Sequence, residues 1–415
     1  MIYSASIRTG SPTGYLARQF TAFVVGIIFC AGMIFVNYRM LLDIGYYLYG
    51  LGACMLVAVL LFGSEIRGTR GWFNLGIFNF QPVEIAKIIF VVSMASYLSI
   101  YWKNIYRLKN FIIPALMLAF NVGLILMQPD FSSSLVYFPI FLFMIFFAGG
   151  NVVHLAHIVL LGAIAAGIPL ISTYIKIKHP WFLKTAIGSL FYKATYDVYT
   201  ALILLGVFAL VTFFIWWFIH KLRFRLPFVF YVSMVLVVSA GVLGSFAVSH
   251  SLKDYQRRRL IVFVDPKIDP LGSGYNILQS RIAIGSGRVF GKGLFGGSQA
   301  ALGFLPEQHT DFIFSVVGEE FGFAGAIFMI FTYAFFVWRI LVIARESRDR
   351  GGSLIASGFA VMFIFYFLTN IAMTMGLAPV TGLPLPLVSY GGSSMVSSWI
   401  AVGILESIHS RRFTY

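Results

Sequence analysis

Long apolar runs constrain this chain more than any other feature of its sequence. Each is close to the roughly twenty residues that an α-helix needs to cross a bilayer. Helices are favoured there because a bilayer offers no water to satisfy backbone polar groups. The runs cover residues 17–36, 46–63, 84–101, 110–127, 131–149, 152–172, 198–219, 226–250, 312–342, 354–377 and 386–408. They predict an all-α polytopic membrane protein, a bundle of about ten to eleven transmembrane helices.

The charge distribution predicts the orientation of this bundle. The formal net charge is +15, although only 11% of the residues are charged. No nucleic acid partner is expected, because the positive residues are scattered over short loops, as in membrane proteins that are basic on their cytoplasmic side. Four such clusters fall on one side, namely Lys103–Lys109, Lys221–Arg225, Arg339–Arg350 and Arg411–Arg412. They predict a multi-pass protein of the cytoplasmic (inner) membrane with its C-terminus in the cytoplasm.

The same orientation makes residues 251–311 one large extracytoplasmic loop, in which charge, glycine and proline occur together. A long polar loop is more often functional than idle. Its Arg281 and Lys292, with backbone N–H groups exposed by glycines, are suited to hold a pyrophosphate. Arg257–Arg259 is interpreted first as an anchor on anionic membrane lipids, with a solvated face or a phosphate site as alternatives.

Ionisable residues inside apolar runs are expensive and face the bundle interior or water. Glu84 and Lys87 lie one helical turn apart and can pair on one face. They form either a structural ion pair or a polar floor beneath a substrate headgroup. Asp130 precedes Ser132, Ser133 and Ser134 and is interpreted first as a helix N-cap.

Asp311 stands at the start of a long apolar run. It is either an N-cap or a carboxylate at the membrane–water interface. A carboxylate partly withdrawn from water has a raised pKa and becomes a better base. Glu319 and Glu320, further along the same run, are expected to be buried and paired.

Several ordered motifs resemble those of the SEDS family (shape, elongation, division and sporulation) of cell-wall proteins. They are Gln81–Lys87 (QPVEIAK), Gln128–Asp130, Asp265–Gly272, Gly274-Tyr275, Gln279-Ser280, Gly303–Gly322 (GFLPEQHTDFIFSVVGEEFG) and Pro384–Ser394 (PLPLVSYGGSS). Gln308, in LPEQHTDF, is more similar to the elongation branch of the family than to the division branch.

The resemblance implies a glycosyltransferase that polymerises lipid II, the undecaprenyl-pyrophosphate-linked precursor, into peptidoglycan for cell elongation and shape. It implies that Asp311 is the essential acid, and that Glu84, Lys87 and Asp130 line the central cavity. The motifs add Gln279, Ser280 and His309 as cavity candidates. A class B penicillin-binding protein, which supplies transpeptidation, is the implied partner, with other cell-wall elongation proteins.

The chemistry of this reaction assigns further roles. An inverting displacement needs a base near the acceptor hydroxyl, for which Asp311 is the candidate. It also needs cations near the leaving pyrophosphate, for which the candidates are Arg281, Lys292 and Arg70. A divalent cation, Mg²⁺ or Mn²⁺, bridging Asp311 and the pyrophosphate is a candidate cofactor, although no metal-ligand cluster in the sequence demonstrates one.

Residues 1–415 are expected to form a single SEDS-type transmembrane domain that departs from the family pattern twice. The start MIYSAS is similar to the end of the family's first helix, so this helix is expected to be missing from the sequence. Residues 173–250 are interpreted as an insertion with one or two extra helices, for which partner docking is one hypothesis.

Two other functions stay open beside the polymerase. A flippase for the lipid-linked precursor predicts a polar path through both leaflets, whereas a polymerase predicts acids at the outer mouth only. A non-catalytic scaffold for a penicillin-binding protein predicts that Asp311→Asn leaves function intact. A division-specific polymerase is the alternative within the family.

Overall fold

The structure is a computed structural model. It describes residues 3–4, 12–66, 68–74, 79–222, 227–251, 262–263, 265–266, 272–299, 304–305 and 307–413. The chain divides into two compact units, Met1–Gly150 with Asn276–Tyr415, and Asn151–Tyr275. Arg257–Arg259, the expected lipid anchor, lies outside the described residues.

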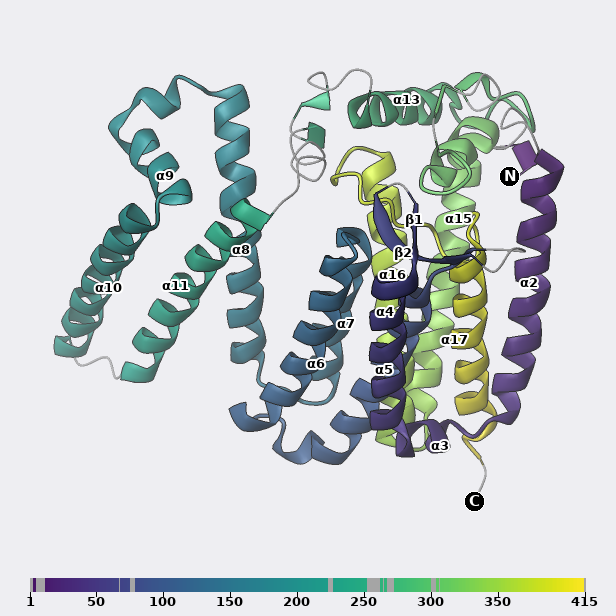
Figure 1. Cartoon of the computed structure of the whole chain (residues 1–415), viewed down its shortest axis with the longest axis horizontal. Coiled ribbons are helices and arrows are strands. Elements are labelled where there is room, and N and C mark those ends of the chain that lie inside the picture. The colour runs from purple at the N-terminus through teal and green to yellow at the C-terminus, as the bar shows by residue number, and fades with distance from the viewer. Residues whose placement is uncertain are drawn as a thin grey trace. The chain divides into compact units, whose positions relative to one another are not determined.

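The first unit is a helical bundle. Its helices are α2 (Pro12–Phe35), α3 (Tyr38–Asp43), α4 (Gly45–Phe62), α5 (Pro82–Tyr101), α6 (Leu108–Met127), α7 (Phe131–Phe147), α15 (Ile313–Glu346), α16 (Arg350–Thr374) and α17 (Gly392–Ser410), with a 3₁₀ turn at Trp102–Asn104. Figure 1 shows the long helices side by side. The most apolar stretches of α5 and α16 are 83% and 72% buried, against 22% in α2. These two helices therefore form the core, and α2 lies at the periphery.

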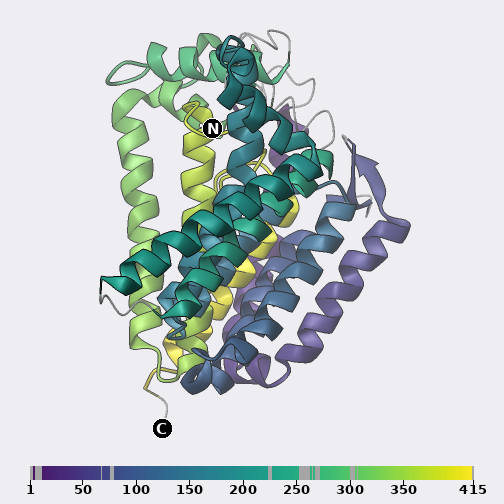
Figure 2. The ribbon, with the colours of Figure 1, turned by 90° about the vertical axis from the view of Figure 1, so that its left-hand side faces the viewer.

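The second unit is also helical. It contains α8 (Val152–Lys178), a 3₁₀ turn (Phe182–Lys184), α9 (Ala186–Tyr196), α10 (Val198–Lys221) and α11 (Phe228–Ser251), whose long helices are seen in Figure 2. Helix α8 packs closely on α11, because a Cβ at Gly241 would lie 2.8 Å from Ile164. The expected insertion at 173–250 lies within this unit, which begins before it and ends after it.

Each of the eleven predicted apolar runs corresponds to a helix of the described chain. Nine of these helices are long and apolar enough to cross a membrane, while α7 has 17 residues and α17 is richer in serine. The prediction of a multi-pass helical membrane protein is confirmed.

The segment 64–83, expected to be a plain loop, contains a small antiparallel sheet. Its strands are β1 (Ser64–Ile66), β2 (Thr69–Asn74) and β3 (Asn79–Phe80), in the order β1-β2-β3. Glu65 faces Arg70 across β1 and β2, and Phe73 faces Phe80 across β2 and β3. Aromatic residues favour such pleated pairs. Pro82 then opens α5 at its first turn, where a missing N–H costs nothing.

Helix α15 is broken at Gly322, whose φ of 64° and ψ of −158° are not helical. The freed N–H groups of Phe323 and Ala324 donate to the carbonyls of Arg288 (2.8 Å) and Val289 (2.9 Å). In return, Lys292 N and Gly293 N donate to the carbonyls of Glu319 and Glu320, both at 3.0 Å. The segment after α13 (Ser273–Ser286) thus supplies hydrogen-bond partners for the backbone groups of the broken helix. Such partners are needed because a bilayer offers no water to these groups.

Candidate functional site

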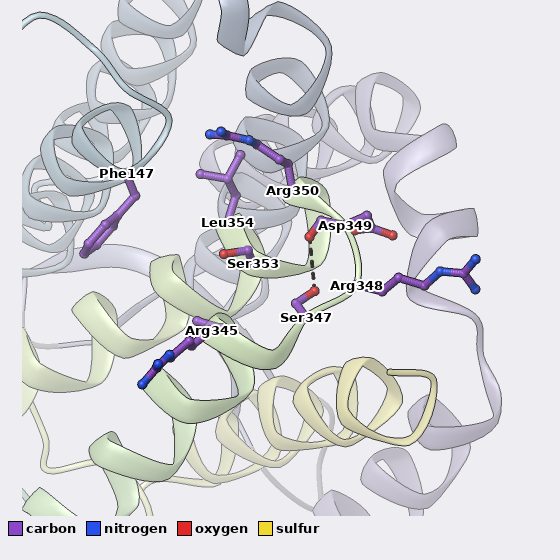
Figure 3. A pocket seen from close by; sticks show the side chains of 9 residues that line it. Phe147, Arg345, Ser347, Arg348, Asp349, Arg350, Ser353 and Leu354 are labelled. Atoms are coloured by element: carbon purple, nitrogen blue, oxygen red, sulfur yellow. Dashed lines mark hydrogen bonds between the residues drawn. The ribbon is translucent and has the colours of Figure 1, made fainter. Parts of the chain in front are cut away.

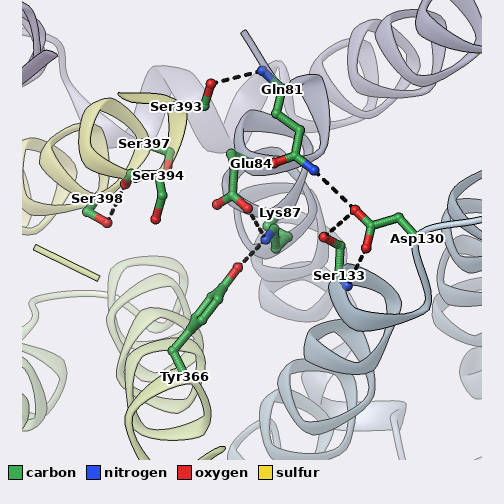
Figure 4. A network of polar contacts seen from close by, with 10 residues as sticks. All are labelled: Gln81, Glu84, Lys87, Asp130, Ser133, Tyr366, Ser393, Ser394, Ser397 and Ser398. Atoms are coloured by element: carbon green, nitrogen blue, oxygen red, sulfur yellow. Dashed lines mark hydrogen bonds and ion pairs between the residues drawn. The ribbon is translucent and has the colours of Figure 1, made fainter. Parts of the chain in front are cut away.

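A buried ion pair lies at the beginning of α5. Lys87 Nζ donates to Glu84 Oε1 at 2.6 Å, and the side chains of Lys87 and Glu84 are only 1% and 8% exposed. Lys87 also donates to the Tyr366 hydroxyl of α16 and lies 4.9 Å from the centre of its ring. Figure 4 shows these three side chains pointing toward one another. The predicted pairing on one helical face is therefore observed, inside the bundle rather than at its surface.

Asp130 caps α7, as predicted, and also contacts α5. It accepts hydrogen bonds from Ser133 N (3.0 Å) and Ser133 Oγ (2.7 Å). Gln81 Nε2 donates to the same carboxylate at 3.1 Å, and Gln81 N donates to Ser393 Oγ of α17 at 2.9 Å (Figure 4). The cap thus belongs to a polar network that joins the first turns of α5, α7 and α17.

Asp311 precedes α15 but does not cap it. The N-cap is Phe312, which makes no side-chain capping bond. Asp311 is instead held by its backbone, because its N–H donates to Glu307 O (3.1 Å) and its carbonyl accepts from Asn370 Nδ2 (2.9 Å). Asn370, buried in α16, also donates to Leu383 O at 2.9 Å. Helix α16 therefore positions the backbone of Asp311, a partly buried residue that directly precedes the N-cap of α15.

The residues before Asp311 rest on the loop between α16 and α17. Ser389 Oγ donates to Thr310 O at 2.6 Å, and Tyr390 N donates to His309 O at 2.8 Å. The His309 ring is buried against Tyr15 of α2 and Tyr390, with ring centres 4.9 and 5.5 Å away. Burial raises the pKa of Tyr390, and a hydrogen bond from Arg18 opposes the shift. His309 thus holds the loop in place.

Helix α13 packs across the first turn of α15, as the views in Figures 1 and 2 place it. Ser280 Oγ lies 2.6 Å from Ser315 Oγ and donates to Thr374 O at 2.6 Å. Ser315 follows Asp311 by one helical turn, so this contact brings α13 close to the acid. The neighbouring Arg281 is exposed, and its Nε donates to Met375 O at 3.1 Å. Gln279, on the same helix, is partly exposed.

Two predicted cations are placed differently. Lys292 Nζ donates to the fully buried Glu319 at 2.9 Å and to Ser298 Oγ at 2.8 Å. This confirms that Glu319 is buried and paired, and it balances the charge of Lys292. Buried Glu320 accepts a hydrogen bond from Ser4. Arg70 is exposed on β2, where its Nε donates to Gly63 O at 3.1 Å.

The sequence motifs included Gln81 and Ser393 without assigning them a role, and sequence reasoning missed Tyr366 and Asn370. Tyr366 and Asn370 are polar residues four apart in a largely apolar run. That spacing places them on one helical face and was an available signal. Among the residues described, no three His, Cys, Asp or Glu side chains gather into a group able to hold a metal ion.

Fold and site together define a class, a multi-pass helical membrane protein whose buried ion pair and positioned acid gather at one end of the bundle. The model of the FtsW/RodA/SpoVE family, described as a cell cycle protein, matches residues 1–206 and 171–413. Peptidoglycan glycosyltransferase RodA of Treponema pallidum (strain Nichols) is 35% identical over 406 residues, which cover 95% of this chain and 89% of that protein. The chain belongs to this family, the SEDS family, and is RodA-like.

Two further matches span the whole chain. Peptidoglycan glycosyltransferase MrdB of Escherichia coli (strain K12) is 31% identical over 417 residues, covering 99% of this chain and 91% of that protein. A chain in a solved structure is also similar; that structure is described as "Structural coordination of polymerization and crosslinking by a peptidoglycan synthase complex". The match has a TM-score of 0.64 and 28% sequence identity, and it covers 99% of this chain and 94% of that one.

Proposed function

We propose that this protein is a peptidoglycan glycosyltransferase that polymerises lipid II into glycan strands for cell elongation and shape. Its relatives named peptidoglycan glycosyltransferase support the activity. The observation that carries the proposal is the position of Asp311, fixed through its backbone by Asn370 beside α13. A carboxylate held this way can meet a substrate hydroxyl without reorganising.

The reaction joins two lipid-linked sugars. The 4-hydroxyl of one attacks the anomeric carbon of the other, and polyprenyl pyrophosphate leaves. Since the donor is α-linked and the product β-linked, a single displacement inverts the centre. Asp311 takes the hydroxyl proton as the new C–O bond forms, an assistance worth about 10²–10⁴-fold.

Arg281 is the first candidate to neutralise the leaving pyrophosphate. Its Nε donates to Met375 O, and among the described residues no bond of its terminal nitrogens is seen, so these can serve as paired donors to phosphate oxygens. Lys292 ranks second, because it would have to leave Glu319, and Arg70 third. Ser280 positions α13 through Ser315 and Thr374, and Gln279 stays a cavity candidate beside it. Mg²⁺ or Mn²⁺ stays a candidate for the substrate phosphates.

Glu84 and Lys87 supply a polar floor in this proposal. Because the two charges neutralise each other, both polar side chains can stay buried inside the bundle. Lys87 donates hydrogen bonds to Glu84 and to Tyr366. Asp130 and Gln81 extend that surface toward α7. These residues bind and orient the lipid-linked headgroup rather than transfer protons.

The orientation belongs to the same proposal. Arg350 stacks on Trp102, and Arg412 pairs with Glu346, so basic clusters from three loops share the end that carries the C-terminus. That end is assigned to the cytoplasm of the inner membrane. Asp311 and the 251–311 loop then face the outside, where a class B penicillin-binding protein would cross-link the product. The 173–250 segment is a candidate surface for that partner.

The distribution of polar groups favours a polymerase over a flippase. Asp130, Glu84 and Asp311 lie at the first turns of α7, α5 and α15, joined by hydrogen bonds through α16 and α17. They gather at one end, whereas a flippase predicts a path through both leaflets.

The test is polymerisation of purified lipid II by the full chain with its transpeptidase partner, whose own activity is blocked. Wild type is compared with Asp311→Asn and with Asp43→Asn, an exposed acid at the end of α3. Glycan strands from wild type and Asp43→Asn, with none from a folded and still paired Asp311→Asn, are expected. Equal product from all three removes Asp311 from the mechanism. No product from any of the three, with each folded and still paired with the transpeptidase, favours the scaffold.

A further inference from the structure

A cavity of about 270 Å³ lies between the end of α7 and the turn that joins α15 to α16, at the opposite end of the bundle from Asp311 (Figure 3). It is separate from the site described above and shares no residue with it. Its lining consists of Phe147, Ala344, Arg345, Ser347, Arg348, Asp349, Arg350, Ser353 and Leu354.

The cavity is electrostatically positive. Figure 3 shows the side chains of Arg345 and Arg350 on the side of Phe147, with the Ser353 hydroxyl between them, while Asp349 points away. Asp349 is also the only acid in the lining. Its carboxylate accepts from Tyr38 (2.8 Å), Arg39 (3.0 Å) and Gly352 N (2.8 Å), so its charge is compensated outside the cavity.

Arg350 is oriented without being neutralised. Its guanidinium lies 3.7 Å from the centre of the Trp102 ring, a cation–π contact that leaves its N–H groups available to an anion. Glu346, which ends α15 just before the turn, pairs with Arg412. Figure 3 shows the two guanidinium groups apart from each other, above and below Ser353, and each can offer a planar pair of N–H donors to phosphate oxygens.

The surroundings point to a lipid as the source of that phosphate. Phe146 and Phe147 are 49% and 42% exposed at the end of α7, as in the aromatic belts at membrane interfaces. Basic pockets between transmembrane helices at the cytoplasmic side bind anionic headgroups. We propose that this cavity binds the phosphodiester headgroup of an anionic phospholipid, with Arg345 and Arg350 as the ligands of the phosphate.

The experiment measures retention of phosphatidylglycerol by the purified full chain, with native mass spectrometry, against phosphatidylcholine. The variant Arg345→Gln/Arg350→Gln is compared with Arg107→Gln/Lys109→Gln, which removes the same charge from exposed residues of another loop at the same end. Each basic residue near anionic lipid contributes about fivefold in affinity. We expect binding to fall about 25-fold in the cavity variant and clearly less in the control, whose side chains are exposed and do not line the cavity.

Several results would overturn the proposal. An equal loss of lipid binding in both variants would mean that general surface charge causes the binding. Unchanged binding in the cavity variant would mean that Arg345 and Arg350 are not ligands of the lipid. If inorganic phosphate displaces the lipid at a concentration similar to that at which phosphatidylglycerol binds the wild type, that result would identify a soluble phosphate as the ligand. If the glutamine variant does not fold, Ser353→Leu fills the cavity and keeps the charges; unchanged binding in that variant contradicts the proposal.

Discussion

Tyr366 and Asn370 lie one turn apart on α16 and join the two halves of the candidate site. The Tyr366 hydroxyl accepts from Lys87 of the buried ion pair, and Asn370 Nδ2 donates to the Asp311 carbonyl at 2.9 Å. Because α16 lies in the core, its backbone fixes the spacing between the polar floor and the acid. We therefore expect the site to depend on α16 residues that make no contact with the reacting atoms.

Asn370→Asp tests this positioning role. The substitution preserves shape but replaces the amide donor with an acceptor, so the carbonyls of Asp311 and Leu383 lose their partner. We expect polymerisation to fall by about 10–100-fold, since displacement of a catalytic group by an ångström costs about 10²-fold. The decrease should lie in kcat, and Asn370→Gln should recover part of it. Thr369→Val, at the neighbouring partly exposed position, is the control. An unchanged kcat in a folded Asn370→Asp protein contradicts the role.

The Glu84–Lys87 pair predicts strong non-additivity in stability. Lys87→Met leaves a buried carboxylate without its cation, which costs about 3–5 kcal/mol. The double variant Glu84→Gln/Lys87→Met should cost much less than the two single changes together. Denaturation in detergent measures all three. Arg412→Gln, which breaks the exposed pair with Glu346, should cost about 0–1 kcal/mol. Additive losses at Glu84 and Lys87 would mean that the pair is not coupled.

Gly291→Ala should disrupt the break in α15. Gly291 has a φ of +79°, and an added Cβ would lie 2.1 Å from the carbonyl oxygen of Glu320. Gly293 has a φ of +86°, but a Cβ added there would have no neighbouring atom within 4 Å. Gly293→Ala therefore costs only the backbone strain of about 1–2 kcal/mol. We expect Gly291→Ala to lose clearly more stability than this matched control in thermal unfolding. Equal losses would show that the close approach to α15 is not needed.

Asp197 predicts a pH dependence at the start of α10. Hydrogen bonds from the Thr200 side chain and backbone lower the pKa of Asp197 below its usual 3.8. Because the folded-state pKa lies below the unfolded-state pKa, the ionised carboxylate stabilises the folded protein at pH values above the unfolded-state pKa. This contribution is lost as the pH falls through the folded-state pKa. Amide exchange at Thr200 should therefore be slower in wild type than in Asp197→Asn near neutral pH. The difference should begin to shrink below about pH 4 and disappear only below the lowered folded-state pKa of Asp197. A constant difference would exclude the carboxylate as its cause.

Local sequence determined the helices and their apolar character. Each predicted run is a helix because a span of such residues must satisfy its own backbone bonds. The pairing of Glu84 with Lys87 and the capping by Asp130 also followed from spacing, since both contacts are within one helical turn. The small sheet at β1–β3 was missed because short strands depend on neighbours more than on their own residues.

Only the tertiary structure decided which polar groups meet across helices. The bonds of Asn370 to Asp311, Gln81 to Asp130 and Lys292 to Glu319 join residues 59, 49 and 27 positions apart, respectively. No periodicity encodes such contacts, because they depend on how helices pack and on where α15 breaks at Gly322. Asp311 is the clearest case. Its place before an apolar run suggested a cap, but packing against α16 fixes its backbone instead. The sequence therefore determined which residues are costly to bury, and packing decided which partners make their burial possible.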